Sequence, residues 1–203
     1  MATYPVDVDV ESPPRFERIQ LLVRVVIAIV AGWFGITAGW LGCVLYGVLP
    51  LVAAISVSSR GDFTTRVAPR LSRVLGWFVQ FSAYMMLLVD RFPTGDDVST
   101  RVTIQVTDRP TTGSALLRLL TSLPSALVLA VLWFVSGILW IVGAVFVLIN
   151  TTIPASILGF QRGVLRWIAN LLAYHASLVV EYPPFSLDTG IHQHPEIAVS
   201  AAR

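Results

Sequence analysis

The stretch LLTSLPSALVLAVLWFVSGILWIVGAVFVLINTTIPASILGFQ, from Leu119 to Gln161, decides the fold class because it contains no charged side chain over 43 residues. A second uncharged run of 33 residues extends from Val25 to Val57. A helix of about 20 apolar residues is long enough to cross a hydrocarbon layer of about 30 Å. The two runs therefore predict an all-α integral membrane protein.

The overall composition supports this class. Of the 203 residues, 55% are hydrophobic and 13% are charged, whereas a soluble domain carries about 25% charged residues. A water-soluble enzyme, a disordered chain and a nucleic-acid-binding protein are therefore excluded. The net charge is only +2. The single cysteine, Cys43, excludes an intrachain disulfide and a cysteine-based metal site.

Two segments near the ends of the apolar runs resemble each other. VLGWFVQFSAYMMLLVDRFP (Val74 to Pro93) aligns with VLRWIANLLAYHASLVVEYP (Val164 to Pro183) at a constant offset. Upstream, VDVDVESPP (Val6 to Pro14) aligns with VTIQVTDRP (Val102 to Pro110). These matches predict two tandem parallel modules, residues 1–93 and 94–188, followed by a flexible C-terminal tail, residues 189–203.

Each module opens with alternating apolar residues, which is typical of a half-buried strand. They are Tyr4, Val6, Val8 and Val10 in the first module, and Val102, Ile104 and Val106 in the second. We expect a small cytoplasmic β layer. The segment YPPFSL, Tyr182 to Leu187, could add an edge strand because its two prolines restrict it to an edge. Extended linkers without pairing are the alternative.

The apolar runs are too long for single perpendicular helices, and two arrangements divide them. In the first, each run is a tight hairpin with its tip near Gly35 to Gly39 or near Ser136 and Gly137. In the second, each is one long tilted helix followed by a return helix, at Val74 to Val89 or Ile168 to Val180. The hairpin arrangement keeps all 14 arginines on one side, which the positive-inside rule favours over a split of 8 to 6.

Both arrangements give four transmembrane helices, and the hairpin arrangement adds two amphipathic interfacial helices. In the second of these, Arg162, Arg166, Asn170, Tyr174, Ser177 and Glu181 form a polar stripe. Either way residues 1–23, 91–117 and 182–203 share one side. Their arginines make it cytoplasmic, and the acidic N-terminus does not fit a secretory signal. We expect a multi-pass protein of the bacterial inner membrane with both termini in the cytoplasm.

Short motifs in the second module carry a family resemblance. They are Arg166-Trp167, Ala173-Tyr174 and the closing segment from Glu181 to Leu187, EYPPFSL. In these motifs the chain resembles a bacterial membrane family known as domain of unknown function 4389. The resemblance implies a strand, an apolar hairpin and the closing segment, repeated twice, and implies no established activity. The first module departs from it at Gly76, which replaces the arginine, and after Arg91.

Two sets of residues are candidates for contacts outside the chain. The first is a small-residue face that allows close approach of a partner helix, made of Gly32, Gly35, Gly39 and Gly42. Intramolecular packing or a glycine-rich turn is the alternative use of this face. The second is a set of candidate lipid headgroup contacts, because guanidinium groups bind phosphate, made of Arg70, Arg73, Arg162 and Arg166.

Catalytic motifs are scarce, so we expect neither an enzyme nor a bound cofactor or metal. His175 is interpreted as a hydrogen-bonded structural residue, and His192 and His194 as part of the flexible tail. The leading hypothesis is a non-catalytic accessory or scaffold subunit of a larger inner-membrane complex. Its partners would be membrane lipids and other integral membrane subunits or a second copy, and no nucleic acid. The alternative is binding or transport of a lipid or small apolar molecule between the two modules.

Overall fold

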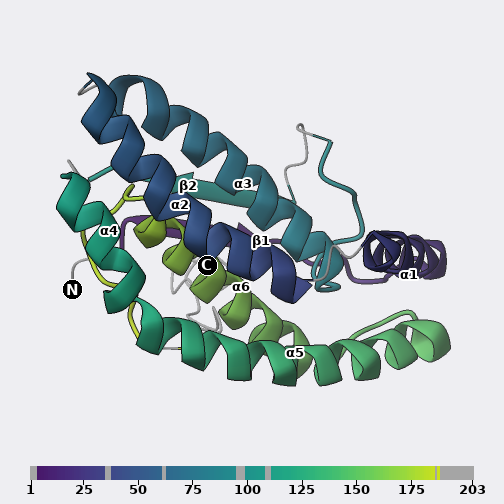
Figure 1. Cartoon of the computed structure of the whole chain (residues 1–203). Coiled ribbons are helices and arrows are strands. Elements are labelled where there is room, and N and C mark those ends of the chain that lie inside the picture. The colour runs from purple at the N-terminus through teal and green to yellow at the C-terminus, as the bar shows by residue number, and fades with distance from the viewer. Residues whose placement is uncertain are drawn as a thin grey trace, which may run out of the picture.

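The computed structural model of the chain describes residues 4–34, 38–60, 63–94, 99–107, 111–185 and 187. The described elements are mostly helical (Figure 1). In chain order they are β1 (Val6–Val10), α1 (Arg18–Trp33), α2 (Ala38–Arg60), a π-helical turn η1 (Phe63–Val67), α3 (Ala68–Met85), β2 (Thr100–Ile104), α4 (Thr112–Thr121), α5 (Leu123–Asn150) and α6 (Ala155–His175).

The two predicted strands form and pair with each other. β1 and β2 are antiparallel, with Val6 opposite Ile104 and Val10 opposite Thr100. The valines of β1 are buried and the intervening Asp7 and Asp9 are exposed, because successive side chains of a strand point to opposite faces. The strand predictions are confirmed, although β2 ends before Val106. Within the described part of the closing segment, residues 182–185 and 187, no third strand forms.

The sheet packs against one helix from each half of the chain. β1 lies against α6 and β2 against α3, while α3 and α6 also contact each other. Two hydrogen bonds fix this layer: Nε of Arg166 donates to Val8 O at 3.1 Å, and Nε2 of Gln80 donates to Thr100 O at 3.1 Å. In Figure 1 the strands lie behind α3 and α6, and α2 lies in front of them. Each strand therefore packs on the helix of the other half.

The first apolar run is divided where the hairpin arrangement predicted. α1 ends at Trp33 and α2 begins at Ala38, close to the expected tip. The two helices do not run as an antiparallel pair. In Figure 1, α1 is seen along its axis, whereas α2 is seen from the side. The run is thus divided by a change of direction.

The second apolar run is not divided at its centre. α5 continues through Ser136 and Gly137, so the turn predicted there is wrong and this half follows the long-helix alternative. The reason is a buried polar pair: Oγ of Ser136 donates to Oε1 of Gln161, and Nε2 of Gln161 donates to Ser136 O at 3.2 Å. Ser136 therefore binds the returning helix α6. The reversal comes after Thr151, whose φ is 59°.

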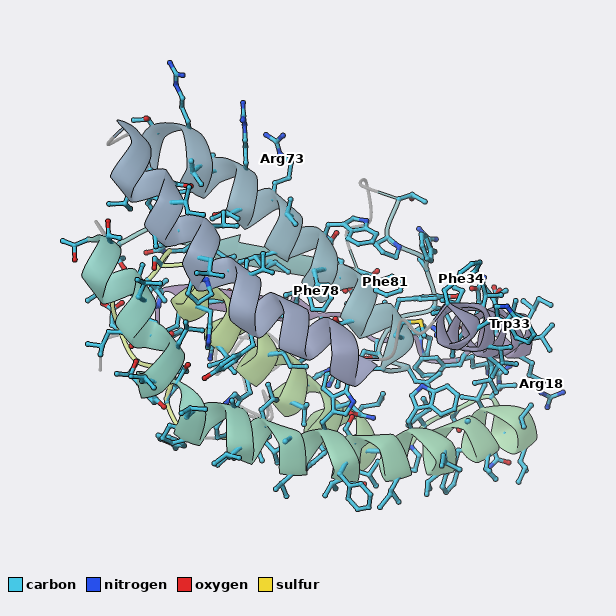
Figure 2. All side chains as sticks on the ribbon, viewed as in Figure 1. Arg18, Trp33, Phe34, Arg73, Phe78 and Phe81 are labelled. Atoms are coloured by element: carbon cyan, nitrogen blue, oxygen red, sulfur yellow. The ribbon has the colours of Figure 1, made fainter. Side chains whose placement is uncertain are left out.

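α5 and α1 leave an apolar surface uncovered. α5 is, among the described residues, the one helix whose length and composition would allow it to cross a membrane, and only 17% of its most apolar window is buried. Trp33, the last residue of α1, and Phe34, directly after it, are 87% and 74% exposed (Figure 2). The exposed residues of α5 include Leu127, Val131, Phe134, Ile138, Ile141, Val145 and Ile149. We call these α5 residues the outward face.

Candidate functional site

Two arginines are the most deeply buried charged side chains among the described residues. Arg24 on α1 is 0% exposed and Arg118 on α4 is 6% exposed. Each reaches the C-terminal end of a helix, where the last backbone carbonyls lack partners within the helix. Each arginine directly precedes an uncharged run, and neither was predicted to have a functional role.

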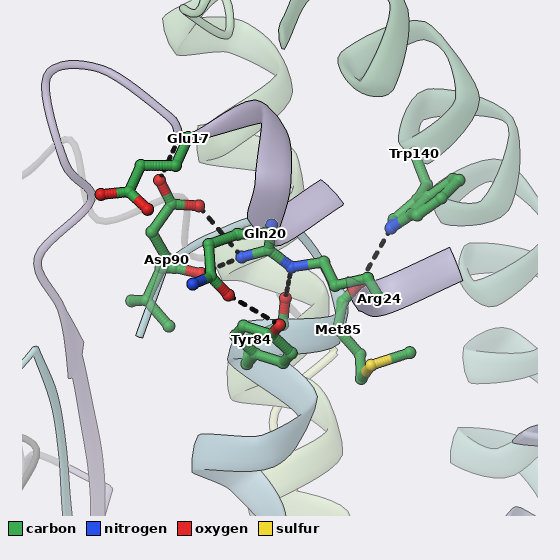
Figure 3. Close-up of polar contacts among 8 residues, drawn as sticks. Glu17, Gln20, Arg24, Tyr84, Met85, Asp90 and Trp140 are labelled. Atoms are coloured by element: carbon green, nitrogen blue, oxygen red, sulfur yellow. Dashed lines mark hydrogen bonds and ion pairs between the residues drawn. The ribbon is translucent and has the colours of Figure 1, made fainter. Parts of the chain in front are cut away.

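Arg24 closes the end of α3 (Figure 3). Its Nε donates to Tyr84 O at 2.7 Å, its Nη2 donates to Val89 O, and Nη2 lies 3.2 Å from Oδ1 of Asp90. The guanidinium carbon lies 4.2 Å from the centre of the Tyr84 ring, a distance that allows a cation–π interaction. We call this arrangement, Arg24 with Tyr84, Val89 and Asp90, the first arginine clamp.

Arg118 closes the end of α6 in the same way. Its Nη1 donates to Tyr174 O and, at 2.8 Å, to Val179 O. The guanidinium carbon lies 4.4 Å from the centre of the Tyr174 ring. Tyr174 and Val179 follow Tyr84 and Val89 by the same number of residues that relates the two matching sequence segments. We call Arg118 with Tyr174 and Val179 the second arginine clamp.

The backbone between the clamp residues is also the same in both places. After α3, Leu87 N donates to Tyr84 O and Leu88 N to Ala83 O; after α6 the same two bonds join Ser177 to Tyr174 and Leu178 to Ala173. This is a Schellman motif, which needs a residue with positive φ after the helix. Leu87 and Ser177 fill that place with φ of 60° and 56°. The clamps therefore hold two copies of one turn.

A polar pocket lies at the open edge of β1. It is lined by Arg162 and Arg166 of α6 and by residues 8–12, and its volume is about 340 Å³. Glu11 N donates to Ser99 O and Gln105 N to Pro5 O, so the odd-numbered residues of β1 bond to β2. Because bonded pairs alternate in an antiparallel ladder, Val8 and Val10 present their N–H and C=O groups to the pocket.

Two arginine side chains lie close together at this pocket. Nη2 of Arg162 donates to Oγ of Ser12 at 2.8 Å, whereas its Nε is enclosed and has no hydrogen-bond acceptor. Burial lowers the pKa of Arg162, and the adjacent charge of Arg166 lowers it further, while Asp9 opposes the effect. The pocket thus holds two neighbouring guanidinium groups, one of them with an unsatisfied buried donor, and is also lined by the acidic residues Asp9 and Glu11. Such a site can bind a phosphate or carboxylate group.

Of the four arginines expected to contact lipid headgroups, two line the pocket and two do not. Arg162 and Arg166 lie one turn apart in the pocket. Arg70 and Arg73 are exposed on α3, and Arg73 points away from the body of the protein (Figure 2). Arg70 and Arg73 do not line the pocket, so the four residues do not form one site.

The glycine face is not continuous. Gly32 belongs to α1, whereas Gly39 and Gly42 belong to α2, which runs in a different direction. A side chain added at Gly32 would meet no atom within 4 Å, so this position has no packed neighbour among the residues that the structure describes. Gly35 lies outside the described residues, as do the surroundings of Gly39 and Gly42.

His175 belongs to a buried polar cluster where α4 meets α5. Its Nε2 lies 3.0 Å from Oγ of Ser122 and its Nδ1 lies 3.2 Å from Leu171 O. The ring packs on Tyr46, with 4.3 Å between ring centres. Burial is the main cause that lowers the pKa of His175, to about 4. Ser122 and His175 are 0% and 1% exposed, so this pair is closed to a substrate and serves the fold, as predicted for His175.

The described residues offer no alternative site for a metal ion. In the described parts of the chain, no group of three or more His, Cys, Asp or Glu side chains could hold a metal ion. His192 and His194 lie outside these parts. The pocket at β1 is therefore the strongest candidate for a ligand.

Comparison with known proteins gives one match. The family described as Domain of unknown function (DUF4389) matches residues 113–186, a segment that includes the second arginine clamp, Arg162 and Arg166. No curated protein and no solved structure matches the chain. The segment from α4 to the residues after α6 is therefore similar to DUF4389, the family suggested by the EYPPFSL motif, and the description of that family names no function.

Proposed function

We propose that the chain is an integral protein of the bacterial inner membrane. The observation that carries the proposal is the outward face of α5, which is apolar along its whole length and almost uncovered. Soluble monomers rarely expose contiguous apolar patches larger than a few hundred Å². The low share of charged residues, 13%, supports the same environment.

Within the membrane, we propose a non-catalytic accessory or scaffold role in a larger complex. The buried polar groups support this role because their bonds serve the fold: Arg24 and Arg118 hold helix ends, and His175 and Ser122 are sealed from solvent. The partners would be membrane lipids together with other integral membrane subunits or a second copy of the chain. No cofactor is part of the proposal.

We also propose that the chain is a tandem pair of the DUF4389 module, residues 1–93 and 94–188. The family match supports the second module. The first is supported by its arginine clamp and by the positive φ of Leu87, which repeats at Ser177. Parallel modules would share one orientation in the membrane.

The sides of the membrane follow from contacts between distant segments. β1 pairs with β2, and the hydroxyl of Tyr4 donates to Glu181 O at 3.1 Å. A bilayer cannot separate paired strands, which supports one shared side for residues 1–23, 91–117 and 182–203. Under the positive-inside rule their arginines make this side cytoplasmic.

Membrane extraction followed by affinity capture tests the proposal. Tagged protein should stay with the membrane after carbonate washing and should co-purify in mild detergent with a stoichiometric polypeptide. Changing Phe134 and Ile141 to Arg on the outward face should weaken retention, while Thr103→Arg on the exposed face of β2 should not. Release by carbonate contradicts a membrane location. Purification as a lone monomer contradicts the accessory role.

A second candidate function is binding of a phosphate-bearing lipid headgroup. The enclosed, unpaired Nε of Arg162 beside Arg166 favours it. The four candidate arginines supply a matched comparison, because two lie in the pocket and two are exposed. Arg162→Gln with Arg166→Gln should remove bound phospholipid from native mass spectra, whereas Arg70→Gln with Arg73→Gln should leave it. Retained phospholipid in the first variant contradicts this candidate.

A further inference from the structure

The C-terminal end of α5 is held by the segment that follows β1. Phe16 N donates to Thr151 O at 2.7 Å, and Nη2 of Arg18 donates to Ile149 O at 3.3 Å. Phe16 and Arg18 lie only a few residues after the strand that pairs with β2. The end of α5 is therefore on the same side of any membrane as these residues.

The N-terminal end of α5 is held by segments that surround the same sheet. Oγ of Ser125 donates to the hydroxyl of Tyr182 at 2.8 Å. The residues before Tyr182 are joined to the end of β2, because Thr107 N donates to Leu178 O at 2.9 Å. Both ends of α5 are thus attached to the flanks of the sheet.

The chain from Tyr4 to Arg18 connects these two attachments. At one end of this segment, Tyr4 binds Glu181, which lies near the start of α5. At the other end, Arg18 binds Ile149, near the end of α5. Between them β1 exposes Asp7 and Asp9, and in Figure 1 the strands and α5 both extend across the view. If α5 crossed the bilayer, β1 would cross beside it with two carboxylates at hydrocarbon depth, where ionised groups are costly.

We propose that α5 lies flat within the cytoplasmic leaflet, with both ends facing the cytoplasm, and that its outward face contacts lipid acyl chains. This inference rests on the proposed membrane location and specifies how the chain meets the bilayer. The sheet, with its exposed carboxylates, then remains in water. The occupant of the outward face is the bilayer itself.

The dimensions and charges agree with this placement. A helix with its side chains is about 10–12 Å wide, and one leaflet contributes about half of a hydrocarbon core of about 30 Å. A flat α5 therefore fits inside one leaflet. It also keeps Arg162 and Arg166 in the cytoplasm together with Ser12 and Val8, which they bind, as the positive-inside rule favours. A crossing α5 would carry these arginines to the other side.

Accessibility of the two ends tests the placement. In a Cys43→Ser background, Thr112→Cys lies before α5 and Asn150→Cys at its end, and both native side chains are exposed. α4 separates Thr112 from α5 by ten residues, about 15 Å of helix, too short to cross. A membrane-impermeant maleimide should label both cysteines in inverted vesicles and neither in intact spheroplasts. Labelling of one cysteine in each preparation overturns the flat placement.

Depth along the helix gives an independent readout. Leu127, Phe134 and Ile141 are 69%, 71% and 62% exposed and follow one another by seven residues, so they share the outward face about 10.5 Å apart. A fluorophore on a cysteine at each position should be quenched equally by lipids carrying a nitroxide at one depth. A maximum at Phe134 with lipids labelled near the bilayer centre overturns the proposal.

The two experiments distinguish a wrong placement from a wrong location. If carbonate releases the protein from vesicles, the proposed membrane location fails and with it the flat helix. If the protein is retained but its ends react from opposite sides, only the flat placement fails, and the four-helix crossing expected from the sequence takes its place.

Discussion

The first and second arginine clamps bind equivalent pairs of backbone carbonyls, but the residues around the two clamps differ. Arg24 is ion-paired with Asp90, which also accepts from Glu17 N at 2.6 Å. The position equivalent to Asp90 is Val180, which is 55% exposed. The backbone contacts are thus common to both halves, while the carboxylate at position 90 has no counterpart at the equivalent position 180. A carbonyl acceptor does not depend on the side chains around it, so the clamp tolerates sequence divergence.

The apolar runs that precede the clamps differ in another way. The run in the first half contains Gly32, Gly35, Gly39 and Gly42 and is divided between two helices, whereas the aligned positions in α5 are Val128, Val131, Val135 and Ile138. Glycine costs a helix interior about 1 kcal/mol relative to alanine. A glycine-rich run therefore bends more readily than one of valine and isoleucine.

Removing the clamp arginines should have the largest effect. Arg24→Met keeps the length of the side chain but removes the hydrogen bonds to Tyr84 O and Val89 O and the buried ion pair with Asp90, which we expect to cost about 3–5 kcal/mol. Arg118→Met removes the hydrogen bonds to Tyr174 O and Val179 O and should cost at least about 3 kcal/mol. Thermal unfolding in detergent measures both effects, with the exposed Arg101→Met as the control. An unfolding temperature equal to that of the control would show that the clamps do not support the fold.

The pH dependence of stability should also differ between the two halves, because the position equivalent to His175 in the first half is Met85. The pKa of His175 is lowered to about 4, so the neutral form stabilises the folded state. This contribution is complete above about pH 6.5 and is lost as the pH falls towards 4, by up to about 3 kcal/mol. His175→Met should flatten the pH dependence of unfolding in that range. Equal slopes for the two proteins would refute the assignment.

Replacing Asp90 with Val gives the first half the residue that the second half has at the equivalent position, Val180. The variant removes the ion pair with Arg24 and the acceptor for Glu17 N, and we expect a loss of about 1–3 kcal/mol, less than for Arg24 itself. In a background that already contains Arg24→Met, the loss should be smaller, because only the acceptor for Glu17 N remains to be removed. Additive losses in the double variant would mean that the two side chains act independently.

Glycine at the two positive-φ positions should give effects of opposite sign. Ser177→Gly relieves the left-handed backbone and removes a buried hydroxyl that has no hydrogen-bond partner, so we expect a gain of about 0.5–1 kcal/mol. Leu87→Gly relieves the same backbone but loses a side chain that is 2% exposed. The second variant should therefore be less stable than the wild type. Stabilisation of both would remove the difference between the turns.

The strands were predictable because their signal is local. Valine alternates with aspartate in β1, and this pattern needs a half-buried strand. The turn at Ser136 and Gly137 was mispredicted because a small polar residue within an apolar run fits two environments. It can end a helix or bind a buried partner, and Gln161 is such a partner. Only the packing of α6 on α5 decides between them.

The arginine clamps could not be recognised from spacing. Arg24 lies 60 residues from Tyr84, and its acceptors are backbone carbonyls, which leave no mark in the sequence. The internal repeat contains one hint of the clamps, because in each half an arginine, Arg24 or Arg118, precedes the repeated Ala-Tyr pair. Similarly, the exposed Arg70 and Arg73 cannot be told from Arg162 and Arg166 until the position of β1 is known.

The exchange of strands between the halves has a consequence for biosynthesis. β1 packs on α6, whose first residue is Ala155, and ribosomes add about 5–20 residues per second. The N-terminal strand therefore waits on the order of ten seconds for its helix, while the apolar residues of α1 are already outside the ribosome. The sheet can close only late in translation. A nascent chain stopped after the first half would expose Val6, Val8 and Val10, and it should depend on chaperones or be degraded.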